Sequence, residues 1–367
     1  MISLSLVAAS TLFVGAHALT PNNLVSASTS GSLSALKYTN VGGTGSYMQV
    51  TNMLPGEWPS CTVNPSCIQT EKQISGNLAP FNEEMTMVFQ GPMNIHNIAV
   101  YQPANSTAAT WKQTSLFNAG QAPTNLVFMN NDGGGASGEW SICGGASQSY
   151  ANGTWNGAAA SPNAQIYNGF LDENSQMNIM TAETCQESAC DGFSRGTANH
   201  GWGDSKMFVM TFDMPPSSTP SKTPAIWGLN AQVVRSAQYG CNCRGMGSPG
   251  GCGEIDILEN LNAAGANPNQ GVSEVYSFKG ATGSGNNNYF ARPLDSIVTY
   301  AVIFDEQTDQ ILIEQLSEWD YTQTAVTRSV IDAYLSSPAM IVSFNTNARR
   351  SERPRSFMGA HRRRHGH

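Results

Sequence analysis

Three acidic residues lie close together in the segment Gly253-Glu254-Ile255-Asp256-Ile257-Leu258-Glu259. The residues between them are branched and apolar, which is typical of a β-strand. Two carboxylates held on one face of a scaffold can act as the nucleophile and the general acid of a retaining glycosidase, whose carboxyl groups lie about 5–5.5 Å apart. The spacing therefore indicates cleavage of a glycosidic bond.

On a regular strand Glu254 and Asp256 share one face, and Glu259 points to the opposite face, into the core. Burying an ionised carboxylate there without a partner is costly. A β-bulge at Ile257–Leu258 would return Glu259 to the face of the other two acids, and we predict one. The two glutamates start roughly 13–16 Å apart along the strand, and their side chains can lean together across Asp256.

Three neighbouring carboxylates do not all ionise easily, so one pKa rises and that group becomes the general acid. The other terminal glutamate stays ionised as the nucleophile, and Asp256 stabilises the changing charge. The alternatives are a solvated acidic edge and a calcium site. A calcium loop needs flexible, turn-forming chain, whereas this segment is stiff and apolar between its acids, so catalysis is favoured.

The scaffold of this strand is predicted from short apolar or alternating runs separated by Gly- and Pro-rich turns. Predicted strands are Ser46–Thr51, Met85–Phe89, Ile95–Tyr101, Asn125–Met129, Met207–Phe212, Ala225–Val234 and Ser273–Phe278. Ile297–Phe304 and Gln310–Leu316 form a predicted hairpin, and only Ser329–Leu335 is typical of a helix. This pattern predicts an all-β fold, a jelly-roll β-sandwich with a concave substrate groove, preceded by a smaller β-rich N-terminal region.

The composition agrees with such a fold. Of the 367 residues, 12% are charged, about half the share in an ordinary soluble domain. Helical bundles and charged disordered proteins need more charge than this. An uncharged polar surface suits a neutral polymer as partner.

The two ends of the chain differ from its body. Residues 1–18 are small and apolar and close on Ala16-His17-Ala18, which predicts a secretory signal peptide rather than a membrane anchor. Residues 19–84 form the Ser- and Gly-rich N-terminal region, and 85–346 the catalytic domain. Residues 347–367 are rich in arginine and are interpreted as a disordered or aberrant tail, because the acidic body offers no nucleic-acid surface. We expect a secreted monomer, extracellular or in the cell wall, with no nucleic-acid or membrane partner.

Eight cysteines follow the signal segment, and an oxidising compartment makes disulfides the expected state: Cys61, Cys67, Cys143, Cys185, Cys190, Cys241, Cys243 and Cys252. The pairings suggested by proximity are Cys61 with Cys67, Cys185 with Cys190, and Cys143 with one of the last three. The last three lack the spacing of a zinc knuckle, so no metal is predicted. Asn105 and Asn152 begin glycosylation acceptor sequences.

The motif GEIDILE resembles the E-x-D-x-x-E signature of laminarinase-like enzymes of glycoside hydrolase family 16. Lys206–Pro215, Thr223–Asn230 and Ile297–Asp305 are similar to strands that flank that signature in the family. More closely, about residues 30–346 resemble fungal glycine-rich secreted cell-wall proteins described as endo-1,3-β-glucanases, through Thr197–Gly203 and Asn230–Gly245. The arginine-rich end departs from that pattern.

The resemblance implies Glu254 as nucleophile, Asp256 as electrostatic helper and Glu259 as general acid/base, with no cofactor. It also implies cell-wall β-1,3-glucan as the substrate, with transfer either to water or to another glucan. A different β-glucan or a galactan keeps the same chemistry, and a non-catalytic glucan-binding or structural glycoprotein is the alternative of another class.

Sugars stack on aromatic rings and hydrogen-bond to planar polar side chains. The candidate substrate-binding residues are Trp227, Asn230, Trp202, His200 and Tyr239. Trp227 shares its strand parity with Leu229, so core packing is an equal alternative for it. With His96 and His200 as the only histidines between signal and tail, a Ser-His-Asp triad is poorly supported.

Overall fold

A computed structural model describes residues 21–26, 31–54, 66–132, 145–146, 148–152, 157–163, 168–194, 196–220, 222–244, 251–261, 267–285 and 287–344. The predictions for the signal peptide, Cys61, Cys143 and the tail from residue 347 lie outside these residues. None of the described helices has the length and apolarity needed to cross a membrane.

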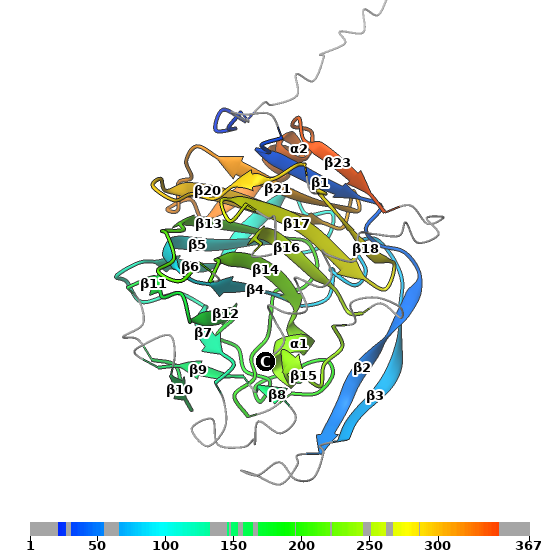
Figure 1. Cartoon of the computed structure of the whole chain (residues 1–367). Coiled ribbons are helices and arrows are strands. Elements are labelled where there is room, and N and C mark those ends of the chain that lie inside the picture. Colours follow the sequence, from blue (N-terminus) through cyan, green and yellow to red (C-terminus); the bar gives the residue numbers. More distant parts are fainter. Residues whose placement is uncertain are drawn as a thin grey trace, which may run out of the picture.

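Two large sheets make up the body of the molecule (Figure 1). The nine-stranded sheet has the order β22 (Ala325–Thr327), β6 (Thr110–Asn118), β5 (Met93–Pro103), β13 (Lys206–Asp213), β20 (Val298–Asp305), β21 (Gln310–Leu316), β1 (Ala35–Thr39) and β23 (Met340–Ser343), and β11 (Phe170–Leu171) pairs with β5. The ten-stranded sheet has the order β10 (Ala158–Ala159), β9 (Ser149–Ala151), β7 (Val127–Asn130), β12 (Gln176–Met180), β4 (Met85–Gln90), β14 (Ala225–Asn230), β16 (Glu254–Asn260), β17 (Gln270–Ser277) and β18 (Gly280–Gly283), and β19 (Phe290–Ala291) pairs with β17.

The main core fills the space between these sheets. On β13, Phe208, Met210 and Phe212 point into it, while Met207 and Val209 point to the other side, as the period of a strand requires. Facing them from the ten-stranded sheet are Ile226 and the apolar residues of the GEIDILE motif, Ile255, Ile257 and Leu258. The predicted all-β sandwich is therefore confirmed.

A helix and an apolar cluster lie on the outer face of each sheet. The helix α2 (Arg328–Leu335) packs Ile331, Tyr334 and Leu335 onto the nine-stranded sheet. The short helix α1 (Ala231–Ser236) follows β14 directly and belongs to a second apolar cluster on the ten-stranded sheet, with Trp227 and Leu229. Both large sheets are thus shielded on two sides.

The predicted strand Ala225–Val234 is wrong in its second half, and the statement that the chain has one helix is wrong with it. β14 stops at Asn230 because this side chain caps α1 by accepting a hydrogen bond from the Gln232 backbone N–H. The hairpin of β20 and β21 and the helix near Ser329–Leu335 are confirmed.

Part of the N-terminal region lies inside the sandwich, since β1 pairs with β21 on one side and with β23 on the other. The strands β2 (Gly45–Leu54) and β3 (Ser66–Ile74) form a separate long hairpin that runs down one side of the molecule (Figure 1). A further small pair joins β8 (Gly145–Ala146) to β15 (Tyr239–Gly240).

The disulfides correct two of the predicted pairings. Cys67 bonds to Cys241 rather than to Cys61, and this bond ties the β2–β3 hairpin to the segment after α1. Cys243 bonds to Cys252, so none of the last three cysteines remains for Cys143. The predicted pair of Cys185 and Cys190 is present.

Candidate active site

The GEIDILE strand contains the predicted β-bulge. Along β14 the partners of Trp227 and Ile226 are Asp256 and Leu258, so Ile257 is an extra residue in β16. The pairing with β17 shifts in the same interval, between Asp256 and Glu259. The bulge keeps the apolar residues Ile255, Ile257 and Leu258 in the main core.

The register places the three acids in one row on the outer face of the ten-stranded sheet. Glu254 lies between Leu229 and Tyr276 of the neighbouring strands, and Asp256 lies between Trp227 and Glu274. Glu259 lies between Ala225 and Val272. Trp227 and Leu229 belong to the outer apolar cluster, so the acids opposite them share that face.

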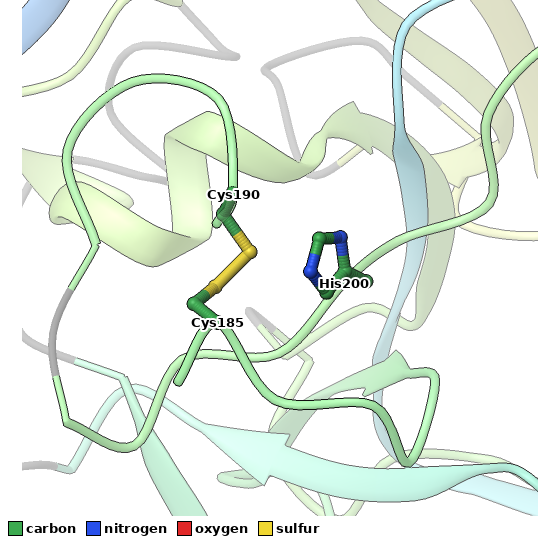
Figure 2. A group of neighbouring side chains, drawn as sticks. All are labelled: Cys185, Cys190 and His200. Carbon is green, nitrogen blue, oxygen red and sulfur yellow. A yellow bond between two sulfur atoms is a disulfide. The ribbon is translucent and has the colours of Figure 1, made fainter. Parts of the chain in front are cut away.

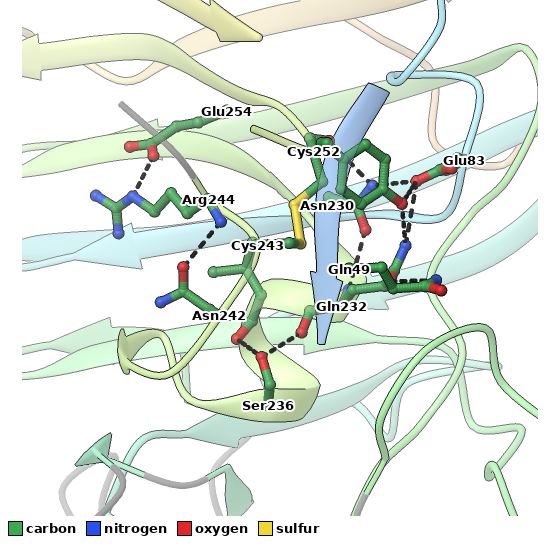
Figure 3. The surroundings of a disulfide bond; sticks show 12 residues. Gln49, Glu83, Asn230, Gln232, Ser236, Asn242, Cys243, Arg244, Cys252 and Glu254 are labelled. Carbon is green, nitrogen blue, oxygen red and sulfur yellow. Dashed lines mark hydrogen bonds and ion pairs between the residues drawn. A yellow bond between two sulfur atoms is a disulfide. The ribbon is translucent and has the colours of Figure 1, made fainter. Parts of the chain in front are cut away.

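These acids are buried rather than spread on an open surface. Glu254 is 0% exposed, and Asp256 and Glu259 are each 1% exposed. Arg244, which follows Cys243 of the Cys243–Cys252 disulfide, forms an ion pair with Glu254 (Figure 3). Burial alone would lower the pKa of Arg244, but the charges of Glu254, Tyr239 and Asp256 raise it, so Arg244 stays protonated beside the row.

A fourth acid, Glu274, extends the row onto β17, where it is the cross-strand partner of Asp256. Its carboxylate accepts a hydrogen bond from the Tyr276 hydroxyl. Burial and the charges of Glu274 and Asp256 raise the pKa of Tyr276, so the hydroxyl keeps its proton. Glu274 thus adds a fourth carboxylate directly across the strand pair from Asp256.

Amide side chains line the same face beyond the acids. Across neighbouring strands, Glu259 pairs with Ala225, and Ala225 pairs with Gln90. Gln90 in turn pairs with Gln176 on β12. Gln176 accepts a hydrogen bond of 2.7 Å from the Tyr239 hydroxyl, and all three polar residues are half-buried. The small side chain of Ala225 separates them from Glu259, so hydrogen-bonding groups of the kind that bind sugar hydroxyls lie beside the row.

The five predicted substrate-binding residues do not lie together in one place. Trp227 lies on the acidic face but is only 1% exposed, and Tyr239 lies near Arg244. Trp202 lies in the main core, where its indole N–H donates to Ser115 and its ring packs edge-on against Phe208. That position, on the opposite side of β16, argues against a role of Trp202 in sugar binding.

Asn230 and His200 belong to a polar network at the end of β14. The Asn230 amide donates to the Glu83 carboxylate and to the carbonyl of Cys252, two residues before Glu254 (Figure 3). Asn230 therefore ties the end of β14 to the segment that leads into β16, rather than standing open to a sugar. His200 is bound to Glu84, close to the Cys185–Cys190 disulfide.

Two family descriptions match this chain. The C-terminal part of cell wall protein YJL171C/Tos1 matches residues 109–334, and its N-terminal part matches residues 34–103. The chain belongs to the Tos1/YJL171C family of cell wall proteins. Membership agrees with the predicted location outside the cell or in the cell wall, and with the fungal cell-wall resemblance of the sequence.

Similar proteins in the Tos1/YJL171C family come from several fungi. A probable circularly permuted 1,3-beta-glucanase of Schizosaccharomyces pombe is 36% identical over 64% of this chain and 48% of its own length. The Candida albicans protein called probable circularly permuted 1,3-beta-glucanase TOS1 is 31% identical over 64% of this chain and 52% of its own length. The chain thus spans about half the length of these two relatives. No solved structure matches it.

Within this family fold, sequence reasoning missed Glu274, Arg244 and the amides of Gln90 and Gln176. Glu274 stands in the predicted strand Ser273–Phe278 and is acidic in a chain with little charge, so composition alone offered a signal for it. Arg244 adjoins a cysteine of the predicted cluster but has no pattern that ties it to Glu254. The two glutamines become neighbours only through strand register.

Proposed function

We propose that this chain is a retaining glycosidase that cleaves or remodels cell-wall β-1,3-glucan, with Glu254 as nucleophile, Asp256 as helper and Glu259 as general acid/base. The observation that carries the proposal is the β-bulge at Ile257, since it brings all three acids to one face. The names of the relatives, probable circularly permuted 1,3-beta-glucanases, support the choice of glucan.

The strand order is compatible with the words "circularly permuted" in that name. A circular permutation joins the old ends of a chain and opens it elsewhere, so it requires termini that lie close together. Here β1 and β23, the first and last strands of the two large sheets, are parallel neighbours. A permuted version of a laminarinase-like sandwich is compatible with this arrangement.

In the proposed reaction the Glu254 carboxylate attacks the anomeric carbon while Glu259 protonates the departing glycosidic oxygen. The bond from the anomeric carbon to that oxygen breaks, and a covalent glycosyl-enzyme ester forms. Glu259, now ionised, removes a proton from water or from a sugar hydroxyl, which displaces Glu254 with net retention. Asp256, between them in the row, stabilises the positive charge that develops on the sugar.

This mechanism requires that the substrate can reach the buried acids. A glucan has to reach side chains that are at most 1% exposed. The contact of Arg244 with Glu254 must therefore open when substrate binds, so that the Glu254 carboxylate can attack. Trp227 then offers an aromatic face beside Asp256, and Gln90, Gln176 and Tyr239 offer hydrogen-bonding groups beside Glu259.

The test compares Glu254→Gln and Glu259→Gln with the native protein on laminarin. Each change should lower turnover by roughly 10²–10⁴-fold, as expected for loss of a group that moves a proton or forms the intermediate. Glu318→Gln, on an exposed residue, is the matched control and should keep full activity. Full activity in either active-site variant would rule out the assigned roles.

The roles themselves can be separated with azide and an activated glucosyl donor. Glu254→Ala should give the α-azide, because azide takes the place of the nucleophile in a single displacement. Glu259→Ala should give the β-azide, because the intermediate still forms. The reverse outcome would exchange the two assignments. Products from 1,3-, 1,4- and 1,6-linked oligosaccharides, with and without an added acceptor sugar, then define linkage and the balance of hydrolysis and transfer.

The burial of the acids favours a second candidate, a non-catalytic glucan-binding wall protein. This alternative predicts that both glutamine variants bind insoluble β-1,3-glucan as well as the native protein does. It also predicts that no product forms from any linkage. Reducing-end formation by the native protein excludes it.

We also propose export with N-glycosylation. Asn105 is exposed in the turn between β5 and β6, where its side chain accepts from the N–H and hydroxyl of Thr107. Asn152 is half-buried, and its acceptor threonine lies outside the described residues. Asn105 should therefore carry glycan more completely than Asn152, which glycopeptide mass spectrometry of the secreted protein measures.

A further inference from the structure

The Cys185–Cys190 disulfide lies directly beside an imidazole. Ligand atoms of Cys185, Cys190 and His200 lie within 4.8 Å of one another (Figure 2). All three residues are half-buried, so the disulfide and the imidazole lie near the surface rather than in the core. Because the two sulfur atoms are bonded to each other, the group offers no pair of thiolates to a metal ion.

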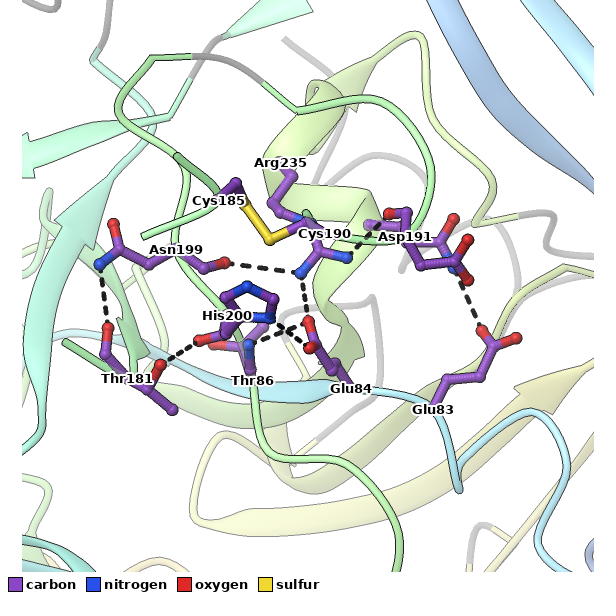
Figure 4. Close-up of polar contacts among 12 residues, drawn as sticks. Glu83, Glu84, Thr86, Thr181, Cys185, Cys190, Asp191, Asn199, His200 and Arg235 are labelled. Atoms are coloured by element: carbon purple, nitrogen blue, oxygen red, sulfur yellow. Dashed lines mark hydrogen bonds and ion pairs between the residues drawn. A yellow bond between two sulfur atoms is a disulfide. The ribbon is translucent and has the colours of Figure 1, made fainter. Parts of the chain in front are cut away.

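His200 is fixed in place and is surrounded by acids. Its Nδ1 lies 2.6 Å from the Glu84 carboxylate (Figure 4). Its Nε2 lies 2.8 Å from the Ser188 hydroxyl. Burial alone would lower the pKa of His200, but hydrogen bonds to Glu84 and Ser188 and the charges of Glu84 and Glu183 raise it. The imidazolium is thus favoured next to the disulfide.

The other charged groups around His200 do not cancel this effect. Arg235 of α1 is a cation, but it binds the second oxygen of the same Glu84 carboxylate and the carbonyl of Asp191. The Asp191 side chain pairs with Lys72 of the β2–β3 hairpin. Glu84 therefore holds a histidine and an arginine together, with the acids Glu183 and Asp191 nearby.

The loop between the two cysteines has hydrogen bonds of its own. The Cys185 N–H donates to the Ala198 carbonyl at 2.9 Å, and the Glu187 carboxylate accepts from the N–H and hydroxyl of Thr184. The disulfide closes a sequence separation of 5 residues, against 174 for Cys67–Cys241. A short closure restricts the unfolded chain least, so this bond contributes the smaller share to stability.

The Cys243–Cys252 disulfide is less exposed than Cys185–Cys190. Cys243 is 4% exposed and Cys252 is 0% exposed, in the apolar cluster below the catalytic strand. That bond is shielded from attack, whereas Cys185–Cys190 is accessible and has a cation that stabilises a thiolate. Accessibility and a stabilised leaving group are the two requirements for fast exchange.

We propose that the Cys185–Cys190 disulfide is a thiol–disulfide exchange site that reacts with external thiolates and is activated by His200. The incoming thiolate attacks one sulfur, a mixed disulfide forms, and the bond between Cys185 and Cys190 breaks. The electron pair leaves on the other cysteine as a thiolate beside the His200 imidazolium. Attack of that thiolate on the mixed disulfide reverses the step, and a second external thiolate completes reduction.

The experiment treats the full-length secreted protein with reduced glutathione, and in a second arm with a single-cysteine peptide. Alkylation and peptide mass spectrometry then follow each disulfide separately. We expect a mixed disulfide at Cys185 or Cys190 while Cys243–Cys252 stays closed. Adducts from both probes define a general thiolate site, and an adduct from glutathione alone restricts it to small thiols.

His200→Gln tests the activation. Exchange should slow by about tenfold below the His200 pKa, because the departing thiolate loses its cation, and the ratio of native to variant rates should fall as pH rises through that pKa. Glu187→Ala loosens the same loop without contacting His200, and its rate ratio should stay constant with pH.

Three results would overturn the proposal. The first is opening of Cys243–Cys252 at the same rate as Cys185–Cys190, and the second is a native-to-variant ratio for His200→Gln that does not change with pH. The third is a reduced protein that forms no adduct but retains Zn²⁺, which would assign the cluster to metal binding. Glucanase activity is not part of any of these readouts, so the exchange site and the proposed function fail or stand separately.

Discussion

The two outer faces of the sandwich bury acidic residues in different ways. On the nine-stranded sheet, α2 covers the face with Ile331, Tyr334 and Leu335, and Glu314 lies beneath it. The Glu314 carboxylate accepts a hydrogen bond of 2.7 Å from Ser337. Its cross-strand partners are Ala35 and Ala301, so no acid lies directly opposite Glu314 on this helix-covered face.

On the ten-stranded sheet the acids stand in a row. Asp256 has Glu274 as its cross-strand partner, with Glu254 and Glu259 further along β16. Like charges directly opposite each other destabilise a sheet, so this arrangement has no value for folding alone. The difference teaches that a helix-covered face can bury an acid that has no other acid opposite it as part of its packing, whereas opposed acids on a bulged strand need another reason, and the proposed catalytic role supplies one.

The comparison is tested most strongly at the helix-covered face. Ile331→Ala removes a fully buried side chain between α2 and the sheet, so we expect the free energy of unfolding to fall by roughly 2–5 kcal/mol. Denaturant unfolding measures it. Ser329→Ala on the exposed side of the same helix is the control and should change stability by less than about 0.5 kcal/mol. Loss of specific activity in folded Ile331→Ala would show that this face also serves the reaction.

Glu314 gives the next largest effect. Burial raises the pKa of Glu314 to about 7 from 4.5, more than Ser337 and Lys37 lower it. Between these values the folded state binds more protons than the unfolded state, so stability falls as pH rises from 4.5 to about 7.

Glu314→Gln removes this ionisation and keeps an acceptor for Ser337. It should raise the free energy of unfolding by about 2–3 kcal/mol at pH 8 and by nothing below pH ~4.5. Unfolding midpoints across this pH range measure the effect. A destabilised variant at pH 8 would mean that the pairing of Glu314 with Lys37 outweighs the cost of burial.

Sequence patterns predicted those features that depend on neighbours along the chain. The β-bulge follows from the conflict between apolar Ile257 and Leu258 and the acid Glu259, and the structure has it. The hairpin of β20 and β21 and the helix α2 also follow from local periodicity.

Features that depend on distant partners were missed or wrong. Asn230 ends a strand only because its side chain finds the N–H of Gln232 and the carboxylate of Glu83. Trp202 reaches the core through an isolated bridge to Met85, which no strand period reveals. Cys67 pairs over a separation of 174 residues, so proximity in sequence gave the wrong partner.

The smallest change in stability is expected for Glu274→Gln. This variant tests whether Glu274 takes part in the reaction or is a structural acid like Glu314. Removing a like charge opposite Asp256 should stabilise the protein by about 0.2–1 kcal/mol, because the repulsion across the strands is lost. At the same time activity on laminarin should fall by about tenfold and its pH profile should move to lower pH, since every ionisation in the row becomes easier. Tyr276→Phe, which removes the donor to Glu274 but keeps its charge, should leave that pH profile closer to the native one. If Glu274→Gln instead loses stability and keeps its pH profile, Glu274 is a structural acid like Glu314, and the row on β16 performs the reaction without it.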